Sequence, residues 1–220
     1  MRLRGVFFTL LIVLLPAVAA EKEIKLEPVD EGAKNPSFRE FRDKLIQAAK
    51  KHDKEFILNI LDPLILNNFG GEGGVREFRE QWEMGKPVCK LWDILFTVLS
   101  LGGTFISVEG KKEFWTPYVY SKFPPDLDAY DYSVIIGKNV IVRKSPDSAA
   151  PPITTLSYHI VRVAKTLHDD SDKPVWVKVV TPSGEKGYVS AKEIRSPLDY
   201  RAGFRQVDGK WVMIALVCGD

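Results

Sequence analysis

The side chains that could carry out catalysis are few, because the chain has only three histidines and two cysteines. His52 lies on the apolar face of a predicted helix, beside Asp53, where it could act as a general base, although a histidine in this setting is more often structural. His159 falls in a predicted strand. His168 precedes the acidic run 169–172, which lacks the ligand spacing and the closing glutamate of a calcium loop. We therefore expect a solvated turn at His168, no metal site and no cofactor.

The two cysteines, Cys89 and Cys218, allow two interpretations. In an oxidising compartment they could form one disulfide that closes a loop of well over a hundred residues. Both also lie in apolar segments, and free cysteine is among the most buried residue types. Neither lies in the local sequence that a catalytic cysteine needs, and the chain has no HExxH, GxSxG or SxxK motif.

One group of acidic residues could serve a hydrolase. Glu72 and Glu77 flank the start of a predicted helix, and Glu80 follows about one turn later. Two carboxylates held at a defined separation can hydrolyse a glycosidic bond. Acidic residues in a first helical turn also interact favourably with the helix dipole, and this is the simpler explanation.

The first twenty residues have the form of a cleavable secretory signal. Arg2 and Arg4 precede an apolar run over 6–15, and small residues at 17–20 form the cleavage region. A membrane-spanning helix needs about 20 apolar residues, roughly twice the length of this run. We expect cleavage after Ala19 or after Ala20, which gives a secreted or periplasmic protein with no stable membrane anchor.

The charge balance limits the classes of partner. The chain has 31 basic and 29 acidic residues, and loss of Arg2 and Arg4 with the signal leaves 29 of each. Nucleic acid and anionic membranes usually require a clear basic excess. The sequence therefore argues against either as the main partner.

Composition divides the rest of the chain. Residues 21–36 are charged and poor in large apolar side chains, which predicts a solvated linker. A helix-rich N-terminal domain is expected over 37–125. It begins at Ser37, which forms a capping-box pattern with Glu40, and apolar residues then recur every three or four positions. Two strands end this domain, and the Pro-rich segment 123–131 marks its boundary.

The second half has the character of β-structure throughout. Five short runs are rich in β-branched residues and are separated by turn sequences. Five strands in about sixty residues indicate a small barrel rather than a sandwich. The runs are 133–136, 140–143, 156–165, 175–180 and 187–189.

These runs resemble the bacterial SH3 (SH3b) domain over residues 132–197. The similarity lies in a valine–arginine strand, a middle strand, a tryptophan–valine strand, a glycine turn and a Gly-Tyr-Val strand. The residues that carry it are Val140–Arg143 with Ser145-Pro146, Ile160-Val161, Trp176–Val179, Ser183-Gly184 and Gly187–Val189. The resemblance implies a small barrel that binds cell-wall peptide or glycan, or that supports a neighbouring domain.

Four aromatic residues are candidates for ligand contact in the expected groove: Tyr132, Tyr158, Trp176 and Tyr188. Aromatic rings present large faces at low entropic cost, and their polar tips can fix a ligand's orientation. The alternative is that Trp176 and Tyr188 fill the barrel core.

The last segment, 198–220, is expected to form a β-hairpin beyond the barrel. It looks like the closing strands of a cystatin-like or NTF2-like α+β fold, which implies that it packs back on the N-terminal domain. A Cys89–Cys218 bridge would support this arrangement. The competing interpretation adds the two strands to the barrel sheet.

The sequence thus predicts an α+β protein: a helix-rich N-terminal unit, a small SH3-like barrel and a C-terminal hairpin. The leading hypothesis is an exported, non-catalytic protein that binds cell-wall peptide or glycan, or a protein partner. One alternative is a cell-wall or carbohydrate hydrolase that uses His52 or the pair Glu72 and Glu77. Another is a periplasmic inhibitor or accessory subunit.

Overall fold

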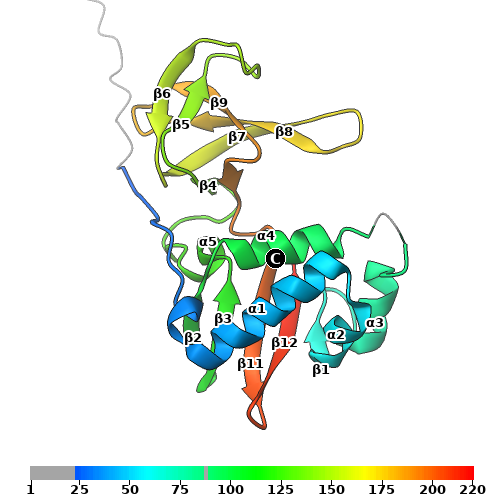
Figure 1. Cartoon of the computed structure of the whole chain (residues 1–220). Helices are drawn as coiled ribbons and strands as arrows, with labels where there is room; N and C mark the ends of the chain where they lie inside the picture. Colours follow the sequence, from blue (N-terminus) through cyan, green and yellow to red (C-terminus); the bar gives the residue numbers. More distant parts are fainter. Residues whose placement is uncertain (1–22, 87–88) are drawn as a thin grey trace, which may run out of the picture.

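The computed structural model describes residues 23–86 and 89–220. The expected signal peptide, 1–20, lies outside the described residues. Within them, no helix combines the length and the apolar character needed to cross a membrane. The chain forms an α/β unit and a second, all-β unit. In Figure 1 the all-β unit lies above the α/β unit.

The α/β unit is built on a five-stranded sheet with the order β1-β12-β11-β3-β2. Neighbouring strands pair antiparallel except for β1 and β12. These two strands run parallel, and Leu61 lies opposite Met213. The first and last strands of this unit are therefore neighbours, although most of the chain separates them. The strands are β1 (Leu61–Leu66), β2 (Thr104–Val108), β3 (Lys111–Thr116), β11 (Arg201–Val207) and β12 (Lys210–Val217).

Helices cover one face of this sheet (Figure 1). The two long ones, α1 and α4, pack against each other. The helical elements are η1 (Gly32–Lys34), α1 (Pro36–Lys51), α2 (Lys54–Asn59), α3 (Gly74–Trp82), α4 (Leu91–Ser100) and α5 (Tyr118–Ser121).

The start and the end of α1 differ from the prediction. Asn35, not Ser37, is the N-cap, and its Oδ1 accepts a hydrogen bond of 3.0 Å from the Phe38 amide. The apolar periodicity of the sequence continues to Ile60, but α1 ends at Lys51, and its C-cap His52 has a left-handed backbone with φ of 55°. Asp53 then caps the separate helix α2.

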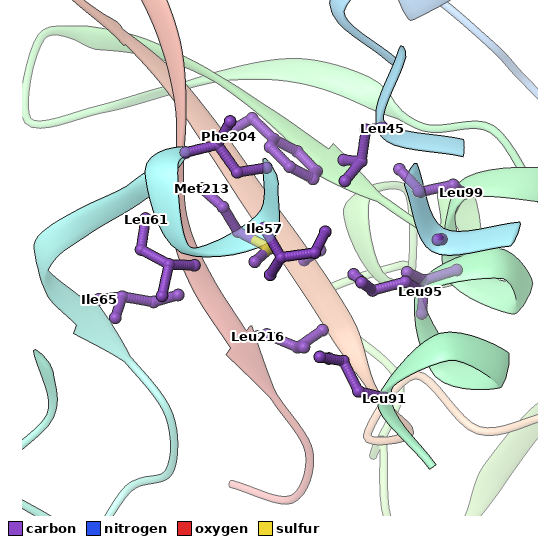
Figure 2. Close-up of a cluster of buried hydrophobic side chains, with 14 of the residues drawn as sticks. Leu45, Ile57, Leu61, Ile65, Leu91, Leu95, Leu99, Phe204, Met213 and Leu216 are labelled. Carbon is purple, nitrogen blue, oxygen red and sulfur yellow. The ribbon is translucent and has the colours of Figure 1, made fainter. Parts of the chain in front are cut away.

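The core of the α/β unit lies between the helices and the sheet. In Figure 2, Leu45, Leu95 and Leu99 from α1 and α4 point toward Phe204 and Met213 of the central strands. These five side chains are almost completely buried. Because both central strands come from residues 201–217, the C-terminal hairpin completes this core. The prediction that the hairpin packs on the N-terminal unit is confirmed, and the alternative of an extended barrel sheet is wrong.

The second unit is a seven-stranded, barrel-like antiparallel sheet with the order β10-β4-β7-β8-β9-β5-β6. Its core consists of side chains that alternate along the strands, including Val142, Val177, Val179 and Val189. The strands are β4 (Tyr132–Ile135), β5 (Val140–Arg143), β6 (Pro152–Leu156), β7 (Ile160–His168), β8 (Pro174–Val180), β9 (Lys186–Ser190) and β10 (Ile194–Arg195).

One glycine of the barrel is required by close packing. A Cβ atom at Gly187 would lie 2.4 Å from Cγ1 of Val142 and 3.0 Å from the carbonyl oxygen of Arg143. Only a residue without a side chain allows β9 to approach β5 so closely.

The segment before α1 corrects the prediction of a solvated linker at 21–36. In the described part, residues 23–35 form an N-terminal strap that runs along both units (Figure 1). On the barrel, the Leu26 amide donates to the Tyr158 carbonyl at 2.8 Å, and the Ile160 amide donates to the Ile24 carbonyl at 2.9 Å. On the α/β unit, the Glu31 carboxylate accepts from the Phe105 amide at 2.8 Å.

Apolar residues of the strap explain why it is ordered. Leu26 is buried in a junction cluster together with Tyr118, Val119, Val134 and Ile160. These residues come from the strap, from α5 and from the barrel strands β4 and β7. The cluster therefore joins the two units.

Replacing Leu26 by alanine is expected to loosen this junction. A buried leucine-to-alanine change typically costs about 2–5 kcal/mol. We expect differential scanning calorimetry of the variant to show two separated transitions, or one transition at a clearly lower temperature. Leu64→Ala is the matched control, because Leu64 is 85% exposed and should leave the transition unchanged. Equal melting profiles for the two variants would contradict the role of the cluster.

Candidate functional site

The outer side of strands β8 and β9 carries the residues best placed to contact a ligand. Val177 and Val179 point into the barrel, so the alternate residues Trp176 and Lys178 point outward. Trp176 and Tyr188 are each half-buried and are not members of the barrel core. The alternative that they fill the core is therefore wrong.

Strand register brings these outward residues together. Lys178 lies opposite Tyr188, and Trp176 lies opposite Leu167 on one side and Ser190 on the other. The Lys178 Nζ atom is 5.4 Å from the centroid of the Tyr188 ring, which is a cation–π contact. We call Leu167, Trp176, Lys178 and Tyr188, together with Arg143 opposite Tyr188, the outer strip.

The outer strip combines apolar faces with positive charge. Arg143, which pairs with Tyr188 in the strand register, uses Nη1 to donate to the Ala150 carbonyl at 2.8 Å. Aromatic rings favour contact with apolar groups, and the two cations favour carboxylates. The outer strip therefore offers an apolar ligand surface next to two positive charges.

The other two candidate aromatics lie elsewhere. Tyr132 packs against the junction cluster, and Tyr158 has a left-handed backbone with φ of 58° while its carbonyl accepts from the strap. Burial raises the pKa of the neighbouring Tyr118 to about 12, and the nearby Tyr158 contributes to the rise. Tyr132 and Tyr158 thus hold the two units together, and the four aromatics do not form one groove.

A polar cleft of about 640 Å³ lies beside the strap, around His159. The imidazole Nδ1 accepts from the Ser157 amide at 2.9 Å, so the ring proton is on Nε2, which donates to Glu23 Oε1 at 2.7 Å. Hydrogen bonds from His159 and then Lys25 hold the pKa of the Glu23 carboxyl below its usual value. Because both ring nitrogens are engaged, neither is left to activate a hydroxyl nucleophile.

The other two histidines also have structural surroundings. His52 stacks on Trp92 with 5.0 Å between ring centroids and 6° between planes. His168 is exposed at the end of β7, beside a turn that Asp169 organises by accepting from Ser171 and from the Lys173 amide. These hydrogen bonds lower the pKa of Asp169. Among the described residues, no cluster of three or more potential metal ligands is found.

The acidic group at α3 is occupied by local contacts. Glu77 accepts from the Gly73 amide at 3.0 Å and so satisfies the start of the helix. Glu72 and Glu80 both pair with Arg76, at 3.0 and 3.2 Å. These contacts agree with the helix-start interpretation.

Of the two interpretations of the cysteines, the Cys89–Cys218 disulfide is wrong, because both thiols are free; Cys89 is half-buried and Cys218 is exposed. The Cys89 thiol is directed at the Trp82 carbonyl, 2.8 Å away, and so points into the helical side of the unit. Cys218 is exposed at the end of β12, beside Tyr200. Burial, and then a hydrogen bond with Cys218, raises the pKa of Tyr200 to about 12. The hairpin is held on the α/β unit by packing and strand pairing without a covalent bridge.

Comparison with known protein families finds a match to part of the chain. Residues 138–195 match the family model described as the bacterial SH3 domain. The matched segment runs from just before β5 to the end of β10 and contains the whole outer strip. Comparisons with curated proteins and with solved structures find no significant match to the chain.

Proposed function

We propose that this chain is an exported, non-catalytic binding protein whose barrel recognises cell-wall peptide or glycan through the outer strip. The match of 138–195 to the bacterial SH3 domain supports a binding module. The observation that carries the proposal is the outward side of β8 and β9, where Trp176 and Tyr188 flank Lys178. Export rests on the sequence of residues 1–20.

The chemistry of the outer strip suits wall peptide. Such peptides alternate small apolar groups with free carboxylates, and the outer strip offers rings beside Lys178 and Arg143. The two rings lie on neighbouring strands, so an extended ligand can contact both at once. A hydrolase is not favoured, because His52, Glu72 and Glu77 are engaged in the structural contacts described above.

The proposal predicts that the double variant Trp176→Ala with Tyr188→Ala loses wall binding. Aromatic anchors at interface centres commonly contribute about 2 kcal/mol or more each, so the two changes together, at about 4 kcal/mol, should weaken binding by about 1000-fold. The measurement is co-sedimentation of residues 21–220 with purified sacculi over a range of protein concentrations.

Tyr130→Ala is the matched control, since Tyr130 is 69% exposed and lies outside the barrel strands. It should bind as the unchanged protein does. Circular dichroism confirms that each variant is folded. Retention of the double variant at the level of the control would refute the outer strip as the site. Absence of wall binding by every form, combined with stoichiometric capture of one extracytoplasmic protein, would show instead that the ligand is a protein.

A further inference from the structure

The α/β unit has a groove of its own, lined by residues from the ends of its two hairpins. Both hairpin ends lie at the end of the sheet that is away from the barrel (Figure 1). The pairing between β3 and β11 ends at Glu113 and Arg205. Both strands continue beyond that point, β3 through Lys111 and Lys112 and β11 to Val207, each paired only with its hairpin partner. The two hairpin ends therefore separate, and a groove of about 610 Å³ lies between them.

Two aromatic rings form the apolar part of this groove. Phe105 of β2 and Trp211 of β12 line it, and both are half-buried. Their ring centroids are 6.2 Å apart, and each ring also contacts Phe38 in the core. Their positions are therefore fixed by packing before any ligand arrives, which lowers the entropic cost of binding.

Planar polar side chains lie next to the rings. Gln206 is exposed in the lining. Asn35 also lines the groove, and its cap to α1 uses Oδ1 and not Nδ2, so the amide can still donate. Asp208 adds an acceptor. Such groups can form paired hydrogen bonds with adjacent hydroxyls.

The cations of the groove differ in their availability. Arg205 is held between Glu113 at 3.4 Å and Asp62 at 3.3 Å. Lys111 and Lys112 are exposed, and within the described part of the chain neither forms an ion pair with an acidic side chain. The Lys112 Nζ atom is held 4.6 Å from the Phe105 ring centroid. A free positive charge thus sits directly beside an aromatic surface.

We infer that this groove is a second binding site and that it takes an acidic oligosaccharide. The rings of Phe105 and Trp211 provide faces for a sugar ring, the amides of Asn35 and Gln206 reach hydroxyls, and the lysines meet a carboxylate. An acidic peptide would match the lysines but would use the planar hydroxyl-binding groups less well. The site is distinct from the outer strip and does not depend on the barrel's ligand.

The test uses residues 21–220 and isothermal titration calorimetry with trigalacturonate. The controls for the ligand are its methyl ester, which lacks the charge, and hexaglutamate, which lacks the sugar. We expect trigalacturonate to bind most tightly, and the double variant Lys111→Ala with Lys112→Ala to bind about tenfold more weakly, since two exposed ion pairs together contribute about 1.4 kcal/mol. Binding should also weaken at high salt.

Two further variants separate the groove from general effects of charge. Lys186→Ala with Lys192→Ala removes the same charge from the exposed surface of the barrel and should leave the affinity unchanged. Gln206→Ala removes a hydrogen-bonding group without changing charge and should weaken binding about threefold, the effect of losing one hydrogen bond. Three results would each overturn the inference. They are failure of trigalacturonate to bind, equal affinities of the two double-lysine variants for trigalacturonate, and tighter binding of hexaglutamate than of trigalacturonate by the unchanged protein. All of these outcomes are independent of the sacculus experiment, which varies the outer strip.

Discussion

Replacing Phe38 by alanine is expected to lower the free energy of unfolding of the α/β unit by about 3–5 kcal/mol. Phe38 is completely buried near the start of α1. Its ring centroid lies 4.2 Å from that of Phe114 in β3, 5.7 Å from Phe204 in β11 and 4.9 Å from Trp211 in β12. Phe105 in β2 also contacts this ring, so the substitution removes packing between the first helix and four strands, and the surrounding chain cannot easily close the cavity.

Phe96→Ala provides the matched control for this variant. Phe96 is also a helical phenylalanine, but it is 46% exposed on α4 and has Lys50 beside its ring. Its loss should cost less than about 1 kcal/mol, as for most exposed positions. Both variants are measured by urea unfolding followed by far-ultraviolet circular dichroism. Similar midpoints for the two would show that Phe38 is not central to the core.

A chain that ends at Ser196 is expected to lose the folded α/β unit altogether. Such a chain lacks β11 and β12, which lie at the centre of the five-stranded sheet. β1 then has no partner strand, and the buried faces of α1 and α4 lose Phe204, Met213 and Leu216. The loss exceeds the total stability of a typical domain, about 5–15 kcal/mol.

Hydrogen exchange measured by mass spectrometry distinguishes the two units in this truncated chain. Amides of α1 and α4 should exchange without protection, whereas those of β7 and β8 in the barrel should remain protected, because all seven barrel strands are retained. The control is a chain that ends at Val217 and keeps both strands of the hairpin. Protection of α1 in the shorter chain would contradict the arrangement described here.

The features that sequence reasoning identified are those that depend on local alternation. Trp176, Val177, Lys178 and Val179 form the expected strand, with the valines inside. The same alternation explains why Trp176 faces outward, since the two valines cannot be buried together with it. The hairpin at 201–217 was also predictable, because two apolar strands flank a short turn and need a core to cover them.

The features that were missed depend on contacts between distant residues. β1 contains Pro63, which argues against a strand, yet it lies at the edge of the sheet, where proline is tolerated. The apolar pattern of the sequence continues past His52, although the helix breaks there. The reason is that the separate helix α2 buries Ile57 in the same core as α1. In each case the partner lies too far away in sequence for the local pattern to reveal it.

The sequence of the strap contained a strand pattern that its high charge made difficult to recognise. Ile24 and Leu26 alternate with Glu23, Lys25 and Glu27, which is the pattern of a strand with one buried side. The high charge suggested a solvated segment, but only the alternate side chains needed to be apolar. Likewise, Tyr132 and Tyr158 resembled ligand contacts because the junction with the strap could not be foreseen.

The position of the barrel between β3 and β11 determines the order in which the chain can fold as it is synthesised. The barrel is contiguous and is complete once β10 has emerged, whereas the α/β unit must wait for the final strand. At about 5–20 residues per second, α1 is formed many seconds before β12 exists. During that interval the apolar side of α1 lacks β11 and β12, which bring Phe204 and Met213 to the core. A chaperone that shields this helix until translation ends would therefore raise the yield of native protein.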